Sequence, residues 1–155
     1  MAQRNKKMGQ PKDAIALLKA DHQRVRDLFQ QYEAMSNAVA KWTIAEEVFI
    51  ELETHAQLEE NIFYPAVHEE TDEGPELVKE SLAEHETMKN LIQQLRDMGP
   101  HNRGFDPKFR ELLQNVEHHV EEETEMFPLA EEELEEDMKD LRDEMQDLKV
   151  QILAS

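Results

Sequence analysis

One short pattern occurs twice in this chain, a histidine followed four residues later by a glutamate, and a similar Phe- and Pro-containing run closes each copy. The first copy reads HAQLEENIFYP from His55 to Pro65, and the second reads HHVEEETEMFP from His118 to Pro128. Residues four apart lie on one face of an α-helix, about 5–6 Å apart at Cβ. The pattern therefore predicts two helices, each carrying a histidine and a carboxylate that can hold one metal ion.

Apolar residues recur three and four positions apart in four segments, which is the spacing of amphipathic helices. The predicted starts of these helices are Asp13, the Thr43–Glu46 capping box, Pro75, and an Asp106 cap followed by Pro107. Pro65 is expected to kink or end the second helix. We see no alternating pattern of useful length that would predict a strand. The sequence thus indicates an all-α fold, an antiparallel up-down-up-down four-helix bundle.

The two halves of the bundle also resemble each other. ADHQRVRDLFQQY at 20–32 parallels AEHETMKNLIQQL at 83–95, with an acid before the histidine and a Gln pair near the end. Each half is therefore predicted to be a helix pair whose first helix carries one histidine and whose second carries the His/Glu pair. The apolar face of the third helix is expected to include Val78, Leu82, Met88, Ile92 and Leu95.

A C-terminal segment follows, with a heptad-like apolar seam that predicts one more amphipathic helix. The seam consists of Leu134, Met138, Leu141, Met145, Leu148 and Ile152. Packing of this helix on its own bundle is the favoured interpretation, and a dimer contact is the alternative. The expected organisation is a basic flexible tail at 1–12, the bundle at 13–130, and an acidic amphipathic helix at 131–155.

Composition narrows the chemistry and the partners. The chain has no cysteine, so disulfides and thiolate metal centres are excluded, and any metal must be held by nitrogen and oxygen. A formal net charge of -19 opposes binding to nucleic acid or anionic membranes. We find neither a secretory signal nor an apolar run long enough to span a membrane. A cytoplasmic protein, either a monomer or a dimer through the C-terminal seam, is expected.

Each predicted helix places one histidine on its apolar face, and the identity of the fourth needs a choice. Counting back from the two prolines favours His118 with Glu122. The apolar stripe of the helix instead favours His119 with Glu123, because Val116 and Leu112 precede His119 on the same face. We follow the stripe. The candidate metal ligands are His22, His55, Glu59, His85, His119 and Glu123.

Four imidazoles and two carboxylates suit iron, manganese or zinc. Sharing between two metal ions is expected, with both glutamates bridging and two histidines on each ion, which leaves positions for an oxo or hydroxo bridge, dioxygen, peroxide or nitric oxide. His68, His101 and His118 are expected at the surface. Tyr32 and Tyr64 could each line the cavity or supply a phenol, but packing is the favoured role for both.

This arrangement of histidines and HxxxE pairs resembles the hemerythrin-like (HHE cation-binding) domain family over roughly residues 13 to 130. The resemblance implies a four-helix bundle with a non-haem di-iron centre, and the six candidate ligands match the ligand positions of the family. Oxygen-carrying hemerythrins have a second histidine on the third helix, where this chain has Lys89. That departure points to the four-His, two-Glu branch, whose members resemble proteins that handle peroxide, nitric oxide or iron.

Two functional hypotheses follow. The first is a di-iron protein that binds or turns over a small oxidant such as O2, hydrogen peroxide or nitric oxide, with catalase-like decomposition or sensing as its role. The alternative is an iron store or donor for the repair of damaged iron centres in partner proteins. A ferritin-like oxidase is disfavoured, because its Glu-x-x-His motif is missing.

Overall fold

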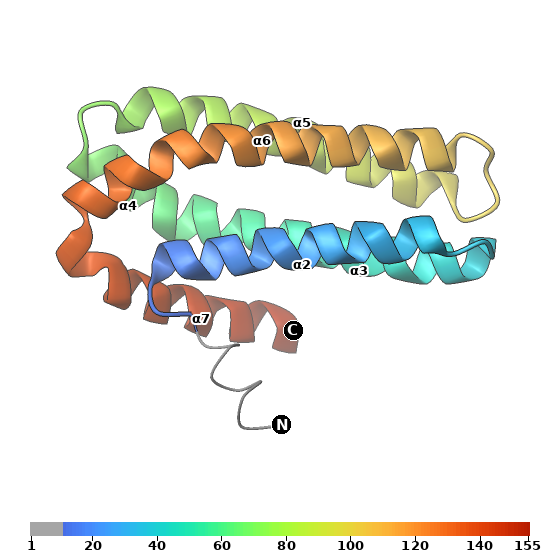
Figure 1. The fold of residues 1–155 in the computed structure, drawn as a ribbon, viewed down its shortest axis with the longest axis horizontal. Coiled ribbons are helices and arrows are strands. Elements are labelled where there is room, and N and C mark those ends of the chain that lie inside the picture. The colour runs from blue at the N-terminus through green and yellow to red at the C-terminus, as the bar shows by residue number, and fades with distance from the viewer. Residues whose placement is uncertain (1–10) are drawn as a thin grey trace.

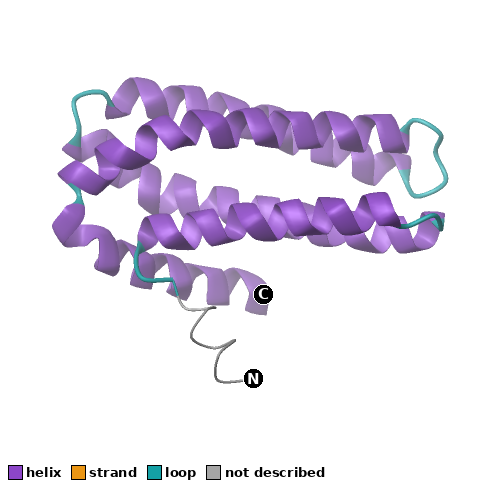
Figure 2. Ribbon diagram, viewed as in Figure 1, coloured by secondary structure: helices purple, strands orange, loops and turns teal. Residues whose placement is uncertain are grey.

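The computed structural model describes residues 11–155, and all the regular structure in that range is helical (Figure 2). Most of the segment expected to be a basic tail, residues 1–10, lies outside the described residues. The helices are α2 (Ala14–Ala34), α3 (Ala38–Leu58), the π-helical turn η1 (Glu59–Phe63), α4 (Tyr64–Glu70), α5 (Gly74–Met98), α6 (Phe105–Glu133), the 3-10 turn η2 (Glu135–Asp137) and α7 (Met138–Ala154).

Helices α2, α3, α5 and α6 form the predicted antiparallel up-down-up-down bundle, and α7 is the additional C-terminal helix (Figure 1). The pairs α2/α3 and α5/α6 are each joined by a short loop and lie side by side. They correspond to the two halves of the sequence repeat. The fold class predicted from periodicity is therefore confirmed.

The predicted helix starts are partly right. The Asp13 side chain accepts a hydrogen bond from the Ala16 backbone N–H at 2.9 Å and caps α2 as expected. The expected capping box at Thr43 is wrong, because α3 already begins at Ala38. Asn37 caps α3 by accepting from the N–H groups of the residues two and three positions later. Thr43 lies inside the helix, where its hydroxyl bonds back to a carbonyl one turn earlier.

A similar correction applies to α6, which begins at Phe105 rather than after an Asp106 cap. Asp106 lies in the first turn, where its carboxylate accepts a hydrogen bond from the Tyr32 hydroxyl of α2. The Lys41 ammonium of α3 lies 3.4 Å from the same oxygen. Asp106 therefore ties three helices together at the end of the bundle instead of capping its own helix.

Pro65 neither ends nor sharply breaks the second helix of the bundle. The helical path continues through the π-helical turn η1 into α4, with Pro65 in the first turn of α4. The Tyr64 N–H bonds to the Glu59 carbonyl five residues earlier, the bond that defines a π turn. This turn takes one residue more than an α-helical turn, so it shifts the register of everything that follows Glu59.

The core consists of two apolar clusters at successive levels of the bundle. One includes Val25, Leu52, Met88 and Val116. The other includes Leu18, Leu58, Phe63 and Met126, together with the first part of α7. One expected core residue is misplaced, since Leu82 is 42% exposed while Ser81 beside it is buried. The level between the two clusters carries the predicted histidines.

Helix α7 packs against its own bundle, mainly along α2 and α3. Leu134, Met138, Leu141 and Met145 of its seam are buried in the second apolar cluster. Leu148 and Ile152 are partly buried against the same cluster. The favoured interpretation of the seam as an intramolecular contact agrees with this packing. Across residues 11–155, we find no helix that is both long and apolar enough to cross a membrane.

Candidate metal centre

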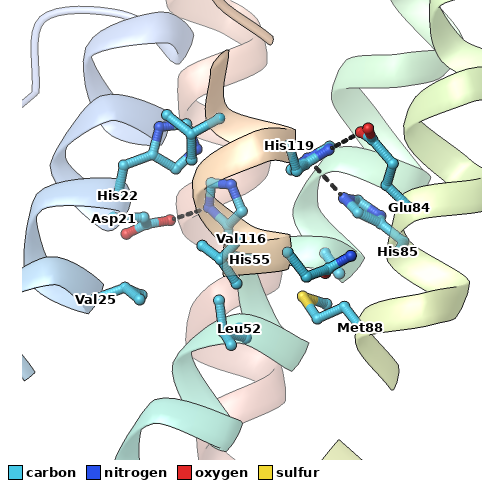
Figure 3. A pocket seen from close by; sticks show the side chains of 13 residues that line it. Asp21, His22, Val25, Leu52, His55, Glu84, His85, Met88, Val116 and His119 are labelled. Atoms are coloured by element: carbon cyan, nitrogen blue, oxygen red, sulfur yellow. Dashed lines mark hydrogen bonds and ion pairs between the residues drawn. The ribbon is translucent and has the colours of Figure 1, made fainter. Parts of the chain in front are cut away.

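The structure brings all six predicted ligands together in the middle of the bundle, and we refer to them as the six-residue cluster. Its members are His22 from α2, His55 from α3, Glu59 from the start of η1, His85 from α5, and His119 and Glu123 from α6. All six side chains are buried, and both glutamates are completely inaccessible. Figure 3 shows the four histidine rings pointing inward from four different helices.

One part of the cluster consists of His22, His55, Glu59 and Glu123, whose ligand atoms all lie within 4.8 Å of one another. The Nε2 atom of His22 lies 3.1 Å from Oε1 of Glu123, and the Nε2 atom of His55 lies 3.3 Å from Oε2 of Glu59. Despite these short distances, none of the four atoms has a hydrogen-bond partner of acceptable geometry among residues 11–155. The four atoms therefore lie close together, buried and without hydrogen bonds to one another.

The other part consists of Glu59, His85 and His119. The Nε2 atom of His85 lies 3.0 Å from Oε1 of Glu59, and that of His119 lies 3.7 Å from the same oxygen. Glu59 thus directs one carboxylate oxygen to each part of the cluster. Glu123 also faces both parts, because its Oε1 atom lies 3.5 Å from His119. Both carboxylates thus lie between the two parts of the cluster.

The unpaired atoms provide a test of whether a metal fits. Buried polar atoms are nearly always hydrogen-bonded, because an unpaired one costs free energy. Two imidazole nitrogens and two carboxylate oxygens left unpaired around one point would be destabilising in an apolar core. A cation at that point removes the cost, and a mixed nitrogen and oxygen donor set suits iron, manganese or zinc. The residues present therefore fit a metal.

Three further carboxylates, which we call the supporting carboxylates, hold the outer nitrogen atoms of three histidines. The Nδ1 atom of His55 lies 2.9 Å from Asp21, and that of His119 lies 2.7 Å from Glu84. Glu60 is 2.7 Å from Nδ1 of His85. A hydrogen bond from Nδ1–H to a carboxylate orients the ring and leaves Nε2 free to bind a metal. Figure 3 shows two of these pairs, formed by Asp21 and Glu84.

These three roles were not predicted from the sequence. A signal was present for two of them, because Asp21 and Glu84 are the acids that precede His22 and His85 at equivalent positions of the repeat. Each acid supports the histidine of the HxxxE pair on the neighbouring helix, not the histidine beside it in sequence. That partner could not be deduced from spacing alone.

The electrostatics of the cluster favour a cation. Burial alone would lower the pKa of His55, but the charge of Glu59 and the contact with Asp21 outweigh burial and raise this pKa to about 10. Burial is likewise outweighed at His119, where hydrogen bonds to carboxylates, led by Glu123, raise the pKa to about 12. Either protons or metal ions can satisfy such a site, and a metal must displace the protons to bind.

The expectation that Tyr64 serves only for packing is corrected, because its phenol lies inside the site. The hydroxyl lies 2.8 Å from an oxygen of Glu123 and 3.1 Å from an oxygen of Glu59, so its one proton can be donated to either carboxylate. It also lies 3.3 Å from Nε2 of both His85 and His119. Burial and the two carboxylates raise the pKa of Tyr64 well above its ordinary range, so the phenol keeps its proton. Tyr64 is therefore a hydrogen-bond donor to this part of the cluster.

The π turn explains why Tyr64 reaches the site. Along an α-helix, a residue five positions after Glu59 points about 140° away from it. In the π turn the fifth residue closes the hydrogen-bonded ring, so Tyr64 comes back toward the face of Glu59. In the second repeat Phe127 takes the equivalent place before proline and stacks on His22, without a hydroxyl.

The other candidates lie where the sequence predicted. His68, His101 and His118 are exposed. Tyr32 is buried against Phe105 and Phe109, away from the cluster, so its packing role is confirmed. Lys89, at the position of the extra histidine of oxygen-carrying hemerythrins, forms an ion pair with Glu60.

A small cavity of about 20 Å³ adjoins the cluster. The four histidines of the cluster contribute to its lining, together with the polar residues Asp21, Glu84 and Asn115 (Figure 3). Its apolar lining residues are Val25, Leu52, Ala56, Met88, Val116 and Val120. This volume is comparable to the space that one water molecule needs. The cavity can therefore admit a water- or dioxygen-sized ligand but not a larger substrate.

Comparison with known proteins gives a consistent result. A family model described as the hemerythrin HHE cation-binding domain matches residues 13–130. A crystal structure of a hemerythrin HHE cation-binding domain-containing protein, described as a homologue from Mycobacterium kansasii, has the same fold, with a TM-score of 0.79 and 22% identity. The match covers 90% of this chain and 86% of that one.

Two curated proteins are similar in sequence. An uncharacterised hemerythrin-like protein of Schizosaccharomyces pombe is 25% identical over 118 residues, which are 76% of this chain and 57% of that protein. A protein of Nostoc sp. named DNA nickase is 27% identical over 107 residues, which are 69% of this chain but 30% of that protein. The chain thus spans about half or less of the length of the curated relatives that it matches.

Proposed function

We propose, from the premise that this chain belongs to the hemerythrin HHE cation-binding domain family, that its six-residue cluster holds two non-haem iron ions and binds or turns over a small oxidant. The observation that carries this proposal is the convergence of four buried, unpaired ligand atoms on one point, with Glu59 facing a second group of histidines beside it. Dioxygen, hydrogen peroxide and nitric oxide are the oxidants that we consider.

The nature of the ligand follows from the cavity. Bound iron supplies redox activity and open coordination positions that the side chains themselves lack. The chain restricts what can approach, because the cavity of about 20 Å³ has room for only a few atoms. The cavity surface is almost entirely apolar, and the four histidines of the cluster contribute to its lining, so a small ligand in the cavity lies beside the imidazole rings.

Other groups of the chain hold the site in one geometry. Asp21, Glu60 and Glu84 fix three imidazole rings through Nδ1, which keeps the Nε2 atoms directed inward. The Tyr64 phenol can donate its one proton to Glu59 or to Glu123, and among residues 11–155 it is the one hydroxyl that we find hydrogen-bonded to the six-residue cluster. It can provide a hydrogen bond, or a proton, to a ligand that binds on the His85 and His119 side.

Nucleic acid is not part of the proposal. The name of the Nostoc relative refers to a protein of which this chain spans 30%. A net charge of -19 makes contact with a phosphate backbone unfavourable.

The test is the iron content and optical spectrum of the full chain, purified and reconstituted without oxygen. We expect about two irons per chain, with near-ultraviolet bands that appear after addition of oxygen and change again with hydrogen peroxide or nitric oxide. Oxygen evolved from peroxide would indicate turnover, and reversible bands without it would indicate binding. His55→Ala should lower the iron content, and His101→Ala, an exposed loop position, is the control. A wild-type chain that binds no iron would contradict the proposal.

A further inference from the structure

The three supporting carboxylates differ in the group that lies against the oxygen facing away from the histidine. Asp21 gives one oxygen to His55 and the other to the Lys149 ammonium of α7, at 3.0 Å. Glu60 gives one oxygen to His85 and contacts the Lys89 ammonium at 3.1 Å with both of its oxygens. In both cases a carboxylate that supports a buried histidine is neutralised from outside by a lysine.

Glu84 has different contacts. Its Oε1 atom accepts from Nδ1 of His119, but its Oε2 atom faces the imidazole Nε2 of His118 at 3.4 Å. The same Nε2 atom lies 3.1 Å from Oε1 of Glu122. Among residues 11–155, neither lysine nor arginine forms an ion pair with Glu84. An imidazole, with a second carboxylate on its other side, thus stands where the two related positions have a lysine.

These three residues have the geometry of a metal site. One ligand atom from each of Glu84, His118 and Glu122 lies within 4.8 Å of the other two. The His118 side chain is 63% exposed, so an ion can reach it from solvent, whereas Glu84 is only 15% exposed. An imidazole and two carboxylates are ligands that Mn²⁺, Fe²⁺ and Zn²⁺ accept. Two ionised carboxylates held this close repel each other, and a cation bound between them relieves the repulsion.

We propose that Glu84, His118 and Glu122 form a second, solvent-exposed site for a divalent cation, in which the ion replaces the lysine found at the other two supporting carboxylates. We further propose, resting on the function proposed above, that metal ions bind there on their way to the buried cluster. Glu84 connects the two places, because it contacts His119 and also lines the cavity beside the cluster.

The key variant is His118→Lys, which restores the lysine pattern of the other two carboxylates and so keeps Glu84 neutralised while removing the metal ligand. Glu122→Gln removes the half-buried carboxylate ligand of the same helix and serves as a second variant. Glu121→Gln is the matched control, because it removes the same charge from an exposed neighbour on the same helix.

The first experiment titrates Mn²⁺ into the iron-loaded full chain and follows free Mn²⁺ by electron paramagnetic resonance. We expect the wild type and Glu121→Gln to bind one Mn²⁺ with the same affinity. His118→Lys and Glu122→Gln should weaken that binding at least about tenfold, with unchanged iron content. Equal Mn²⁺ binding by the wild type and His118→Lys would overturn the exposed site.

The second experiment measures how fast the metal-free full chain takes up Fe²⁺ without oxygen. His118→Lys should reach the same final iron content several-fold more slowly than the wild type. Equal rates would overturn the role in loading. Failure of the proposed function would give a different result, because a chain that takes up no iron can still be titrated with Mn²⁺. If His118→Lys then loses Mn²⁺ binding and His55→Ala keeps it, the exposed site is still identified.

Discussion

Asp21→Asn is expected to weaken metal binding at the six-residue cluster about 10- to 100-fold. In the wild type the Asp21 carboxylate lies 2.9 Å from Nδ1 of His55 and is only 5% exposed. Burial opposes its charge, but the contacts with His55 and Lys149 outweigh burial and lower its pKa, so it is ionised at neutral pH. The amide of asparagine has the same shape and can still accept a hydrogen bond, but it carries no charge.

The magnitude follows from the role of such contacts. Loss of a group that orients a metal-bound histidine costs about 10- to 100-fold in affinity, or about 1.4–2.7 kcal/mol. Asp21 is the one hydrogen-bond partner of His55 Nδ1 within the described chain, so nothing else there compensates. The same change leaves Lys149 opposite a neutral amide, which should also lower the stability of the metal-free protein modestly.

Competition for Fe²⁺ between the protein and a chelator of known affinity, without oxygen, measures the change directly. Asp27→Asn is the matched control, because Asp27 lies on the same helix but is exposed. Within residues 11–155, we find its side chain hydrogen-bonded only to Gln23. Far-ultraviolet circular dichroism checks that both variants are folded. Iron affinity equal to that of Asp27→Asn would refute the reasoning that Asp21 orients a ligand.

Further predictions concern the register, the pH dependence and α7. His119→Ala should lose bound iron, whereas His118→Ala should keep the iron of the buried cluster; iron analysis decides, and the reverse result would mean that the ligand assignment is wrong. Because the pKa of His55 is raised from 6.5 to about 10, the folded metal-free chain holds a proton that the unfolded chain releases, so its free energy of unfolding should fall as pH rises from 6.5 toward 10. Urea unfolding at several pH values tests this, and a flat profile over that range would contradict it. Met145→Ala removes a fully buried side chain of α7 and should cost about 2–5 kcal/mol in chemical denaturation. Val150→Ala, at a position 68% exposed, should change the stability by less than about 0.5 kcal/mol.

Much of the fold followed from local patterns. The four long helices, the C-terminal helix and the inward faces of the histidines were all predicted from apolar spacing of three and four. Helical periodicity reports which residues share a face, and a buried face in a bundle must point at the core. Errors occurred where several residues could play the same local role. Asn37 caps α3 in place of the Thr43 box, and Asp106 bonds to Tyr32 instead of capping α6.

The pairing of groups from different helices could not be read from spacing. Asp21 supports His55, and Glu84 supports His119, across sequence separations of about 35 residues. Such contacts depend on the rotation and offset of neighbouring helices, which is set by the packing of whole helix faces. The same holds for Lys149, which comes from α7 to contact Asp21.

The choice between His118 and His119 in the second HxxxE pair shows most clearly what spacing predicts and what tertiary structure decides. Counting from the prolines pointed to His118, and the apolar stripe pointed to His119; the structure buries His119 and exposes His118. The one-residue discrepancy comes from the first repeat, where the π turn places one more residue between Glu59 and Pro65. Helical periodicity identified the buried histidine because it is a local property of the chain. The π turn depends on tertiary structure, where the Tyr64 phenol bonds to carboxylates brought in by other parts of the fold.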